Sequence, residues 1–170
     1  MKLPENSYTV IDNFLSEKEH EKLHSLLISG NFPYYYQNSV SYASEYDPNY
    51  YFEHMIYKNK SPWSWFFGDV GEIFVQKLQL TELIRMKVNC FPREQTNIHH
   101  GFHKDMYGKH YVALYYVNTN NGYTILDLND EKIKIESVAN RMVIFDGNIS
   151  HSAVSQTDEK IRVNVNINFL

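Results

Sequence analysis

The stretch that decides the fold is residues 161–169, which are Ile-Arg-Val-Asn-Val-Asn-Ile-Asn-Phe. Apolar and polar residues alternate at every position. Since successive side chains of a β-strand point to opposite faces of a sheet, this segment predicts a strand with one buried face and one polar face. The apolar face is Ile161, Val163, Val165, Ile167 and Phe169, and the polar face is Arg162, Asn164, Asn166 and Asn168.

The 90 residues from 81 to 170 show β-character throughout. Runs of β-branched and aromatic residues are separated by turn residues, without a helical pattern between them. Strands connected in this way cannot form parallel βαβ units, so we expect an antiparallel sandwich or jelly roll. The expected strands are 83–91, 98–105, 110–118, 123–128, 132–137, 141–146, 151–155 and 160–169.

The first 80 residues mix short strands with two helix candidates. Ser16 and Glu19 have the spacing of a capping box, and Leu23 and Leu27 follow at helical spacing. We therefore predict one domain, 1–170, in which residues 1–80 pack on a mainly β core formed by 81–170. The elements expected here are helices over 16–29 and from about 69 to 80, and strands over 8–12, near 36–42 and over 51–57.

Composition narrows the class of protein. The chain has 170 residues, a formal net charge of −4 and a single cysteine, Cys90, which we expect to be a small buried hydrophobe. One cysteine excludes an internal disulfide and a Cys-cluster zinc site. The net charge argues against nucleic acid as the main partner.

Without a stretch of ~20 apolar residues or an apolar leader, we expect an intracellular, cytoplasmic protein with no membrane partner. Many Asn and Tyr and few Ala residues suggest an AT-rich genome, as in a phage or bacterium.

His103-Lys104-Asp105 is the first sign of chemistry. In a strand, His103 and Asp105 would point to the same face. His151 follows Asp105 by 46 residues, at the start of another expected strand. Two histidines and one carboxylate form the facial triad that binds Fe(II) and leaves open coordination positions. Two solvated polar residues are the alternative interpretation of the His-x-Asp pair.

Arg162 strengthens the metal hypothesis. It lies 11 residues beyond His151 and opens the most regular strand of the chain. A guanidinium can hold a carboxylate through two charge-assisted hydrogen bonds. An edge strand with a solvated polar face is the alternative.

These features together resemble the 2-oxoglutarate/Fe(II)-dependent dioxygenases with a double-stranded β-helix core, and most closely their prolyl-4-hydroxylase-like branch. The resemblance covers roughly residues 81–170. The matching segments, in order, are Cys90-Phe91-Pro92, His103-x-Asp105, Leu114-Tyr115-Tyr116-Val117-Asn118, Asn121-Gly122, residues 140–145 before His151, and Arg162.

The resemblance implies an enzyme that hydroxylates a C–H bond and consumes O2 and 2-oxoglutarate, releasing succinate and CO2. His103, Asp105 and His151 would bind Fe(II), and Arg162 and Tyr116 would hold the distal carboxylate of 2-oxoglutarate. Ascorbate is a candidate reductant, and a prolyl or other residue of a protein or peptide is the candidate substrate. The other residues expected to line the cosubstrate pocket are Leu114, Phe91, Thr124 and Asn164.

Three positions depart from the family pattern. Phe91 stands where a Tyr is common, so one hydrogen bond to 2-oxoglutarate is expected to be absent. Asn121-Gly122 replaces a Gly-Gly pair, and Asn168 replaces an aromatic residue.

Two other functions stay open. A nucleic-acid demethylase of the alkylation-repair type has Arg-x-Asn and Asn-x-Tyr motifs, which Arg162-Val163-Asn164 and Asn89-Cys90-Phe91 resemble. That family has a second Arg where this chain has Asn168, so we rank nucleic acid below protein as the substrate. A non-enzymatic metal-binding jelly-roll protein is the second alternative.

The remaining candidates have structural alternatives. His99 could line the substrate entrance and His110 the pocket rim, although a surface position is favoured for His99. His20 and His24 lie four apart on the first expected helix and could bind a stray metal, but a solvated helix face is the favoured interpretation. Aromatic residues are dense over 34–67, where we favour packing on the core, with 42–50 as a candidate lid over the site.

Overall fold

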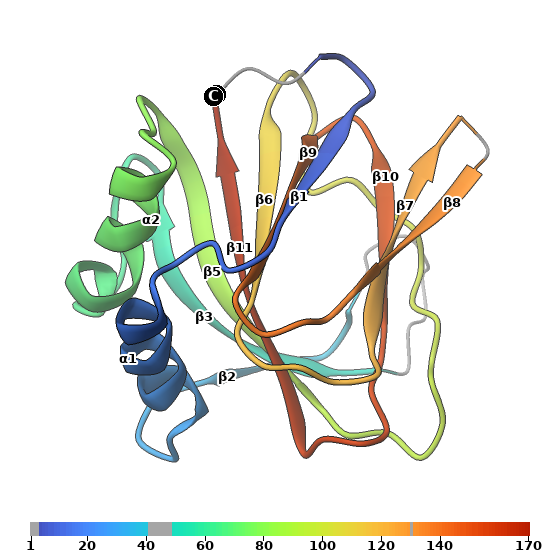
Figure 1. Ribbon diagram of the computed structural model, residues 1–170, viewed down its shortest axis with the longest axis horizontal. Coiled ribbons are helices and arrows are strands. Elements are labelled where there is room, and N and C mark those ends of the chain that lie inside the picture. The colour runs from blue at the N-terminus through green and yellow to red at the C-terminus, as the bar shows by residue number, and fades with distance from the viewer. Residues whose placement is uncertain (1–3, 41–48, 130) are drawn as a thin grey trace.

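The computed structural model describes residues 4–40, 49–129 and 131–170. Within these ranges, two antiparallel sheets face each other (Figure 1). The larger sheet has the strand order β1-β9-β6-β11-β5-β3-β2, with β4 also paired to β3, and the smaller has the order β10-β7-β8. The predicted jelly roll of the double-stranded β-helix type is therefore confirmed.

The strand bounds follow the expected pattern closely. In the larger sheet they are β1 (Tyr8–Ile11), β2 (Tyr35–Gln37), β3 (Tyr51–Lys58), β4 (Ser61–Pro62), β5 (Leu83–Pro92), β6 (Tyr111–Tyr116), β9 (Arg141–Asp146) and β11 (Ile161–Phe169). In the smaller sheet they are β7 (Tyr123–Leu128), β8 (Glu131–Glu136) and β10 (Ser150–Val154).

Strand β11 lies in the middle of the larger sheet. It pairs with β5 along one edge and with β6 along the other. The edge-strand alternative for residues 161–169 is therefore wrong. Both faces of β11 are buried: Val163, Val165 and Ile167 pack under the helices, while the polar face looks into the space between the sheets. That polar face carries the chemistry described below.

Two helices cover the outer face of the larger sheet (Figure 1). Helix α1 (Glu17–Ile28) begins with the predicted capping box, in which the Ser16 hydroxyl and the Glu19 carboxylate bond to each other's backbone N–H. Helix α2 (Glu72–Lys77) follows a π-helical turn, η1 (Phe67–Gly71). It ends before residue 80, since the chain turns at Gln79, where φ is 51°. No helix in the described ranges is both long and apolar enough to cross a bilayer.

A second apolar cluster fills one end of the space between the sheets. Val112, Leu114 and Tyr116 of β6 meet Leu126 of β7 and Phe145 of β9 there. The alternation of β6 therefore gives its residues two environments, because Ala113 and Tyr115 belong to the cluster under the helices.

The expected strand over 98–105 is wrong. This segment makes only two isolated bridges in the described structure, His99 with Val154 and His103 with His151. It runs beside β10, but Gly101 and the polar residues around it provide no continuous apolar face to bury. The candidate lid over 42–50 lies mostly outside the described residues.

Candidate metal centre

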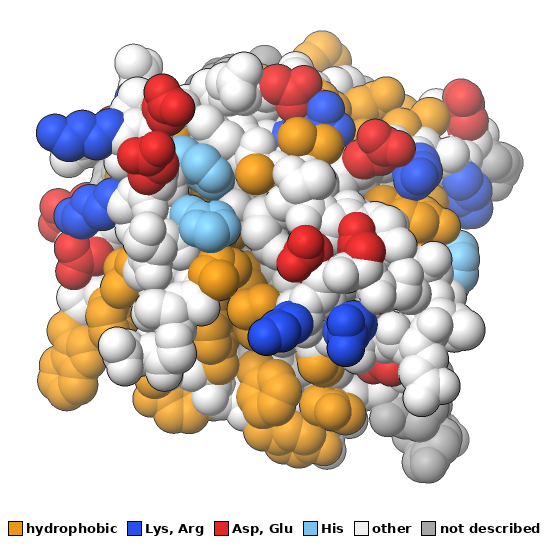
Figure 2. Space-filling model, turned by 60° about the horizontal axis from the view of Figure 1, so that its bottom comes forward, with side chains coloured by type: hydrophobic (Ala, Val, Ile, Leu, Met, Phe, Trp, Pro, Cys, Tyr) orange, Lys and Arg blue, Asp and Glu red, His pale blue; other side chains and the backbone are white. Residues whose placement is uncertain are grey.

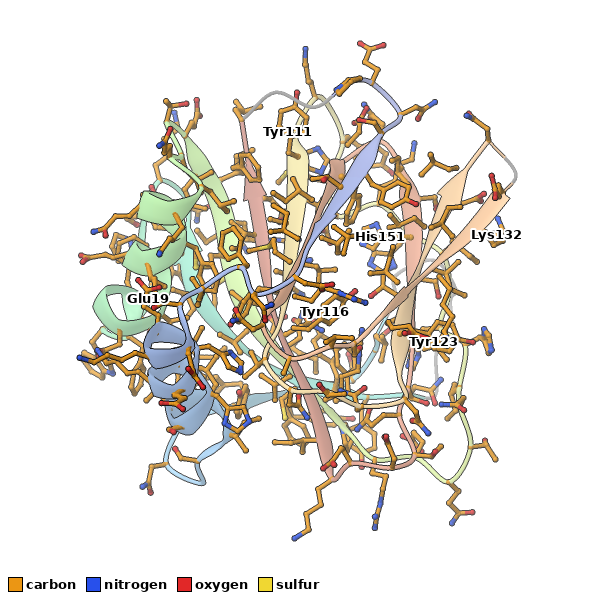
Figure 3. All side chains as sticks on the ribbon, viewed as in Figure 1. Glu19, Tyr111, Tyr116, Tyr123, Lys132 and His151 are labelled. Carbon is orange, nitrogen blue, oxygen red and sulfur yellow. The ribbon has the colours of Figure 1, made fainter. Side chains whose placement is uncertain are left out.

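His103 and His151 are brought together by the backbone. His151 is in β10, and the loop that carries His103 is bound to it by two hydrogen bonds, each 2.9 Å, between the N–H of one residue and the C=O of the other. The two ring centroids are 4.6 Å apart. One ligand atom from each of His103, Asp105 and His151 lies within 4.8 Å of the others, so small side-chain rotations would bring all three to one ion. His151 points into the space between the sheets (Figure 3).

Both imidazoles are oriented for metal binding. The Nδ1 of His151 lies 3.3 Å from the carbonyl oxygen of Ile149, and that of His103 lies 3.2 Å from the carbonyl oxygen of Gly101. Such contacts place the proton on Nδ1 and leave the Nε2 lone pair for a metal. Burial lowers the pKa of His151 to about 4, which keeps the ring neutral near pH 7. The donor set fits a divalent transition metal such as Fe(II).

Asp105 is held by the polar face of β11. Its Oδ2 accepts hydrogen bonds from the side-chain amides of Asn166 (3.0 Å) and Asn168 (2.9 Å). Its Oδ1 lies 4.0 Å from His151 Nε2 and 3.1 Å from Nη2 of Arg85. Burial raises the pKa of Asp105, but His151, Arg85 and the two amides outweigh burial and hold the pKa well below its usual range. The carboxylate is therefore ionised, with Oδ1 directed at the histidines.

Arg162 is buried among hydroxyl groups and aromatic rings. Only 1% of its surface is exposed. Its Nε donates to the Ser137 hydroxyl at 2.9 Å and its Nη2 to the Thr124 hydroxyl at 3.2 Å, and the guanidinium lies over the rings of Phe91 and Tyr116. Among the described residues, no carboxylate lies within 4.0 Å of it. A buried charge is costly unless it is paired, so this guanidinium is suited to an anionic ligand.

Gly122 permits this burial. A Cβ at position 122 would lie 3.0 Å from Cδ of Arg162 and 2.9 Å from the carbonyl oxygen of Val154. A side chain at this position would therefore push against Arg162 or against the backbone.

The three metal-ligand candidates and Arg162 line one cavity. Its inner part measures about 60 Å³, an adjoining outer part measures about 610 Å³, and His103 and Asp105 line both. The inner volume is that of roughly four to six water molecules. Four of the expected cosubstrate residues line the inner part: Phe91, Leu114, Thr124 and Asn164.

Tyr116 lies beside the Arg162 guanidinium. It does not line the cavity, and its hydroxyl donates to the Thr124 hydroxyl at 2.8 Å. The ring of Tyr116 therefore packs against the Arg162 guanidinium, and its hydroxyl holds Thr124. His99 and His110, expected at the substrate entrance and the pocket rim, also lie away from the cavity. His99 packs against Tyr123, and His110 lines a separate small cavity beside Asp146.

The sequence did not indicate two cationic residues that lie beside the site. Arg85 donates from Nε to Asn168 Oδ1 at 2.8 Å, and Lys87 bonds to Glu53 at 2.9 Å and to the Tyr51 hydroxyl at 3.0 Å. The signal was present in β5, where Arg85, Lys87, Asn89 and Phe91 alternate with apolar residues. Their importance follows from the register, in which this face of β5 lies beside the polar face of β11.

Comparisons with known proteins identify the fold. Protein-family models give no match to this chain, and curated protein sequences give none either. Solved structures do match. A prolyl-4-hydroxylase from Pseudomonas putida has a TM-score of 0.70 at 13% identity, over 95% of this chain and 91% of that one.

Two further structures show the same likeness. A prolyl hydroxylase from Trichoplax adhaerens, in complex with a peptide of the hypoxia inducible factor oxygen degradation domain, has a TM-score of 0.68 at 15% identity, over 97% of this chain and 84% of that one. HygX from Streptomyces hygroscopicus, with nickel and 2-oxoglutarate bound, has a TM-score of 0.63 at 10% identity, over 95% and 82%. The chain therefore has the double-stranded β-helix fold of the 2-oxoglutarate/Fe(II) oxygenases.

Proposed function

We propose that this protein is an Fe(II)- and 2-oxoglutarate-dependent oxygenase that hydroxylates a C–H bond of its substrate and releases succinate and CO2. One observation carries the proposal. A His-Asp-His group able to hold a metal shares a cavity with a buried arginine that has no carboxylate partner among the described residues. A structural metal site would need neither open coordination positions nor a buried cation beside it.

In this proposal, His103, Asp105 and His151 hold Fe(II) on one side and leave the opposite side open. Bound Fe(II) would supply the activation of O2, coupled to decarboxylation of 2-oxoglutarate. Asn166 and Asn168 fix Oδ2 of Asp105, so only Oδ1 is offered to the metal.

Arg162 binds the distal carboxylate of 2-oxoglutarate in this proposal. Ser137, Thr124 and the ring of Phe91 hold the guanidinium in place before the ligand arrives. Pre-organisation of this kind lowers the entropic cost of binding. Phe91 has no hydroxyl, so the hydroxyl of Thr124 is the polar neighbour left to share the carboxylate.

A protein or peptide residue, such as a prolyl residue, is the substrate we propose. The likeness to the prolyl hydroxylases supports this choice, since one of them is in complex with a peptide. The outer cavity provides the space, at about 610 Å³. Tyr51 and Lys87 line it, and the ion pair of Lys87 with Glu53 supplies a polar wall.

The decisive experiment is an anaerobic titration of the protein with Fe(II) and 2-oxoglutarate, followed by the weak visible absorption band of their chelate. We expect a band in the native protein and a rise in the dissociation constant for 2-oxoglutarate of about 100-fold or more in Arg162→Met, because two charge-assisted hydrogen bonds are lost. Lys160→Met, which removes an exposed cation two residues before Arg162, is the matched control. Absence of the band in the native protein at saturating Fe(II) would reject the proposal.

Succinate, a reaction product, distinguishes the oxygenase from the non-enzymatic alternative. A metal-binding jelly-roll protein without catalysis would bind Fe(II) but form no succinate from 2-oxoglutarate under air. Succinate formation that depends on Fe(II) supports the oxygenase.

A nucleic-acid demethylase remains the second candidate because of Arg85. This arginine lies beside Asn168, the position at which that family has its second arginine, so β5 supplies a guanidinium to the same place. On the face shown in Figure 2, however, basic and acidic side chains are interspersed, without a basic patch. Binding to single-stranded DNA that weakens steeply with salt would favour this candidate over a protein substrate.

A further inference from the structure

A second cleft lies on the other side of the larger sheet. It measures about 740 Å³ and separates α1 from the turns that carry Asn118, Thr119 and Glu159. No residue lines both this cleft and the cavity of the candidate metal centre. Strand β6 divides the two regions, because Tyr115 faces the helices and Tyr116 faces the interior.

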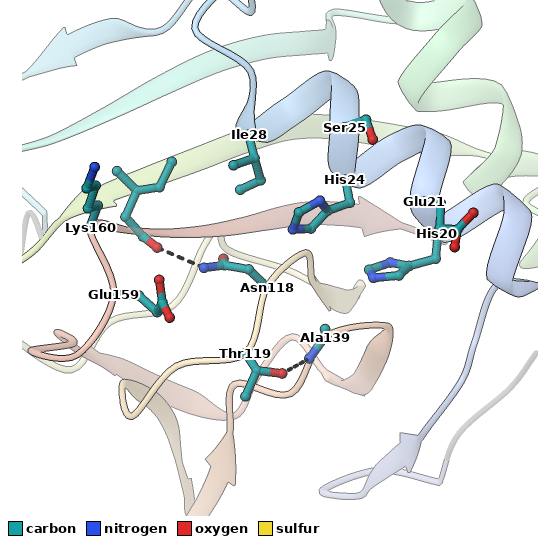
Figure 4. A pocket seen from close by; sticks show the side chains of 11 residues that line it. His20, Glu21, His24, Ser25, Ile28, Asn118, Thr119, Ala139, Glu159 and Lys160 are labelled. Carbon is teal, nitrogen blue, oxygen red and sulfur yellow. Dashed lines mark hydrogen bonds between the residues drawn. The ribbon is translucent and has the colours of Figure 1, made fainter.

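Two histidines of α1 project into this cleft (Figure 4). Residues 20–24 are His-Glu-Lys-Leu-His, so the imidazoles are four residues apart and share one face of the helix. Their ring centroids are 5.8 Å apart. Leu23, between them, is buried in the core and holds this turn of the helix in place. The spacing is the one by which a helix presents two imidazoles to a single zinc ion.

The tautomer of His20 follows from its neighbours. The Asn140 amide is fixed by two 2.9 Å contacts with Leu15, in which Nδ2 donates to the carbonyl and Oδ1 accepts from the N–H. Tyr115 donates its only hydroxyl proton to that Oδ1 at 3.1 Å. The Tyr115 oxygen must therefore accept from His20 Nδ1, 2.7 Å away. The proton is on Nδ1, and Nε2 keeps its lone pair.

This arrangement is typical of a metal ligand. A metal-bound histidine generally donates its other N–H to a fixed acceptor, which orients the ring. Burial, and the neighbouring His24, lower the pKa of His20, so its neutral form is favoured. Both rings are half-buried, and an ion bound between them would still be open to the cleft.

We propose that His20 and His24 form a second metal site, which takes a borderline divalent ion such as Zn(II), Ni(II) or Cu(II) through Nε2 of His20 and one ring nitrogen of His24. Glu21 and Glu159 also line the cleft. In the part of the chain that the structure describes, however, neither completes a group of three protein ligands. Water or a small ligand in the cleft would fill the other coordination positions. The sequence favours a solvated helix face for these residues, and the half-burial of both rings is the observation that differs from it.

Metal stoichiometry tests the proposal. Metal-free protein is titrated calorimetrically with Ni(II), and we expect two ions per native chain. His24→Gln should bind one ion. Ser25→Ala, on the same helix and lining the same cleft, is the matched control and should bind two. The proposal is rejected if His24→Gln still binds two ions or if the native chain binds only one.

Two further measurements separate this site from the candidate metal centre. His151→Ala disables the triad, and it should keep one Ni(II) that the double variant His151→Ala/His24→Gln loses. On the native chain, Zn(II) should protect His20 and His24 from carbethoxylation by diethyl pyrocarbonate, as located by peptide mapping. This test needs no substitution, so it holds even if a variant fails to fold. Equal modification with and without Zn(II) would contradict the site.

Discussion

The two histidine-bearing regions of this protein are built in opposite ways. In the cavity between the sheets, His103, Asp105 and His151 come from a loop and a strand that are far apart in the sequence. On α1, His20 and His24 come from a single turn of helix. Local periodicity can align two ligands, whereas a third requires contacts between distant segments. The non-local site is accordingly the more complete one, and the variants below test this difference.

The largest effect is expected from Asp105→Ala. Removal of a carboxylate ligand should lower Fe(II)-dependent succinate formation by more than about 100-fold, because a metal ligand matters at least as much as the residues that orient it. The Ni(II) site on α1 should be unaffected. Succinate assays and calorimetry measure the two properties. Asp127→Asn, a half-exposed carboxylate paired with Lys132, is the control. Full succinate formation by Asp105→Ala would refute the ligand assignment.

Asn166→Ala should have the next largest effect. It removes one of the two amides that hold Oδ2 of Asp105, and the loss of such a contact typically lowers metal affinity by about 10- to 100-fold. The affinity for Fe(II) or Mn(II) can be measured by competition with a chelator. Asn164→Ala lies on the same face but bonds to Asn89, so the metal affinity of that variant should not change. Equal metal affinities in the native protein and Asn166→Ala would show that Asn166 does not orient the ligand.

Tyr115→Phe should affect the α1 histidines and leave the triad unchanged. It removes the acceptor that fixes Nδ1 of His20, and it should weaken Ni(II) binding on α1 by roughly 10-fold. Metal binding by the triad should stay as it is in the native protein. Tyr123→Phe, a tyrosine in contact with neither α1 histidine, controls for the loss of a hydroxyl. If both variants behave alike, Tyr115 has only a packing role.

The smallest effect is expected from Ser16→Ala. Loss of the hydroxyl that caps α1 should lower the free energy of unfolding by about 1 kcal/mol. Denaturant titration measures this change, with Ser25→Ala in the same helix as the control. Because the cap lies one turn before His20, the variant also tests whether a less stable helix weakens Ni(II) binding on α1 while the triad is unchanged. An unchanged midpoint would mean that core contacts alone hold the helix.

Much of the fold could be predicted because its elements carry local signals. Strict alternation predicted β11, and β7 and β9 have the predicted bounds. The segment 98–105 was the exception, since its two bridges depend on where β10 lies and not on a pattern of its own. Of the candidate site, the ligand residue types and Arg162 were visible in the sequence. The roles of Arg85 and Lys87 were not, since they depend on which face of β5 turns inward.

The local sequence is sufficient to define the periodicity of β11, the cap of α1 and the spacing of His20 and His24, because each depends on backbone geometry over a few residues. Tertiary contacts are needed to bring His103 to His151, to place two amides on Asp105, and to bury Arg162 beside hydroxyls. They also fix the tautomer of His20, through Tyr115 and Asn140. These contacts join residues far apart in the chain, and sheet register and helix packing, which no local pattern specifies, bring them within bonding distance.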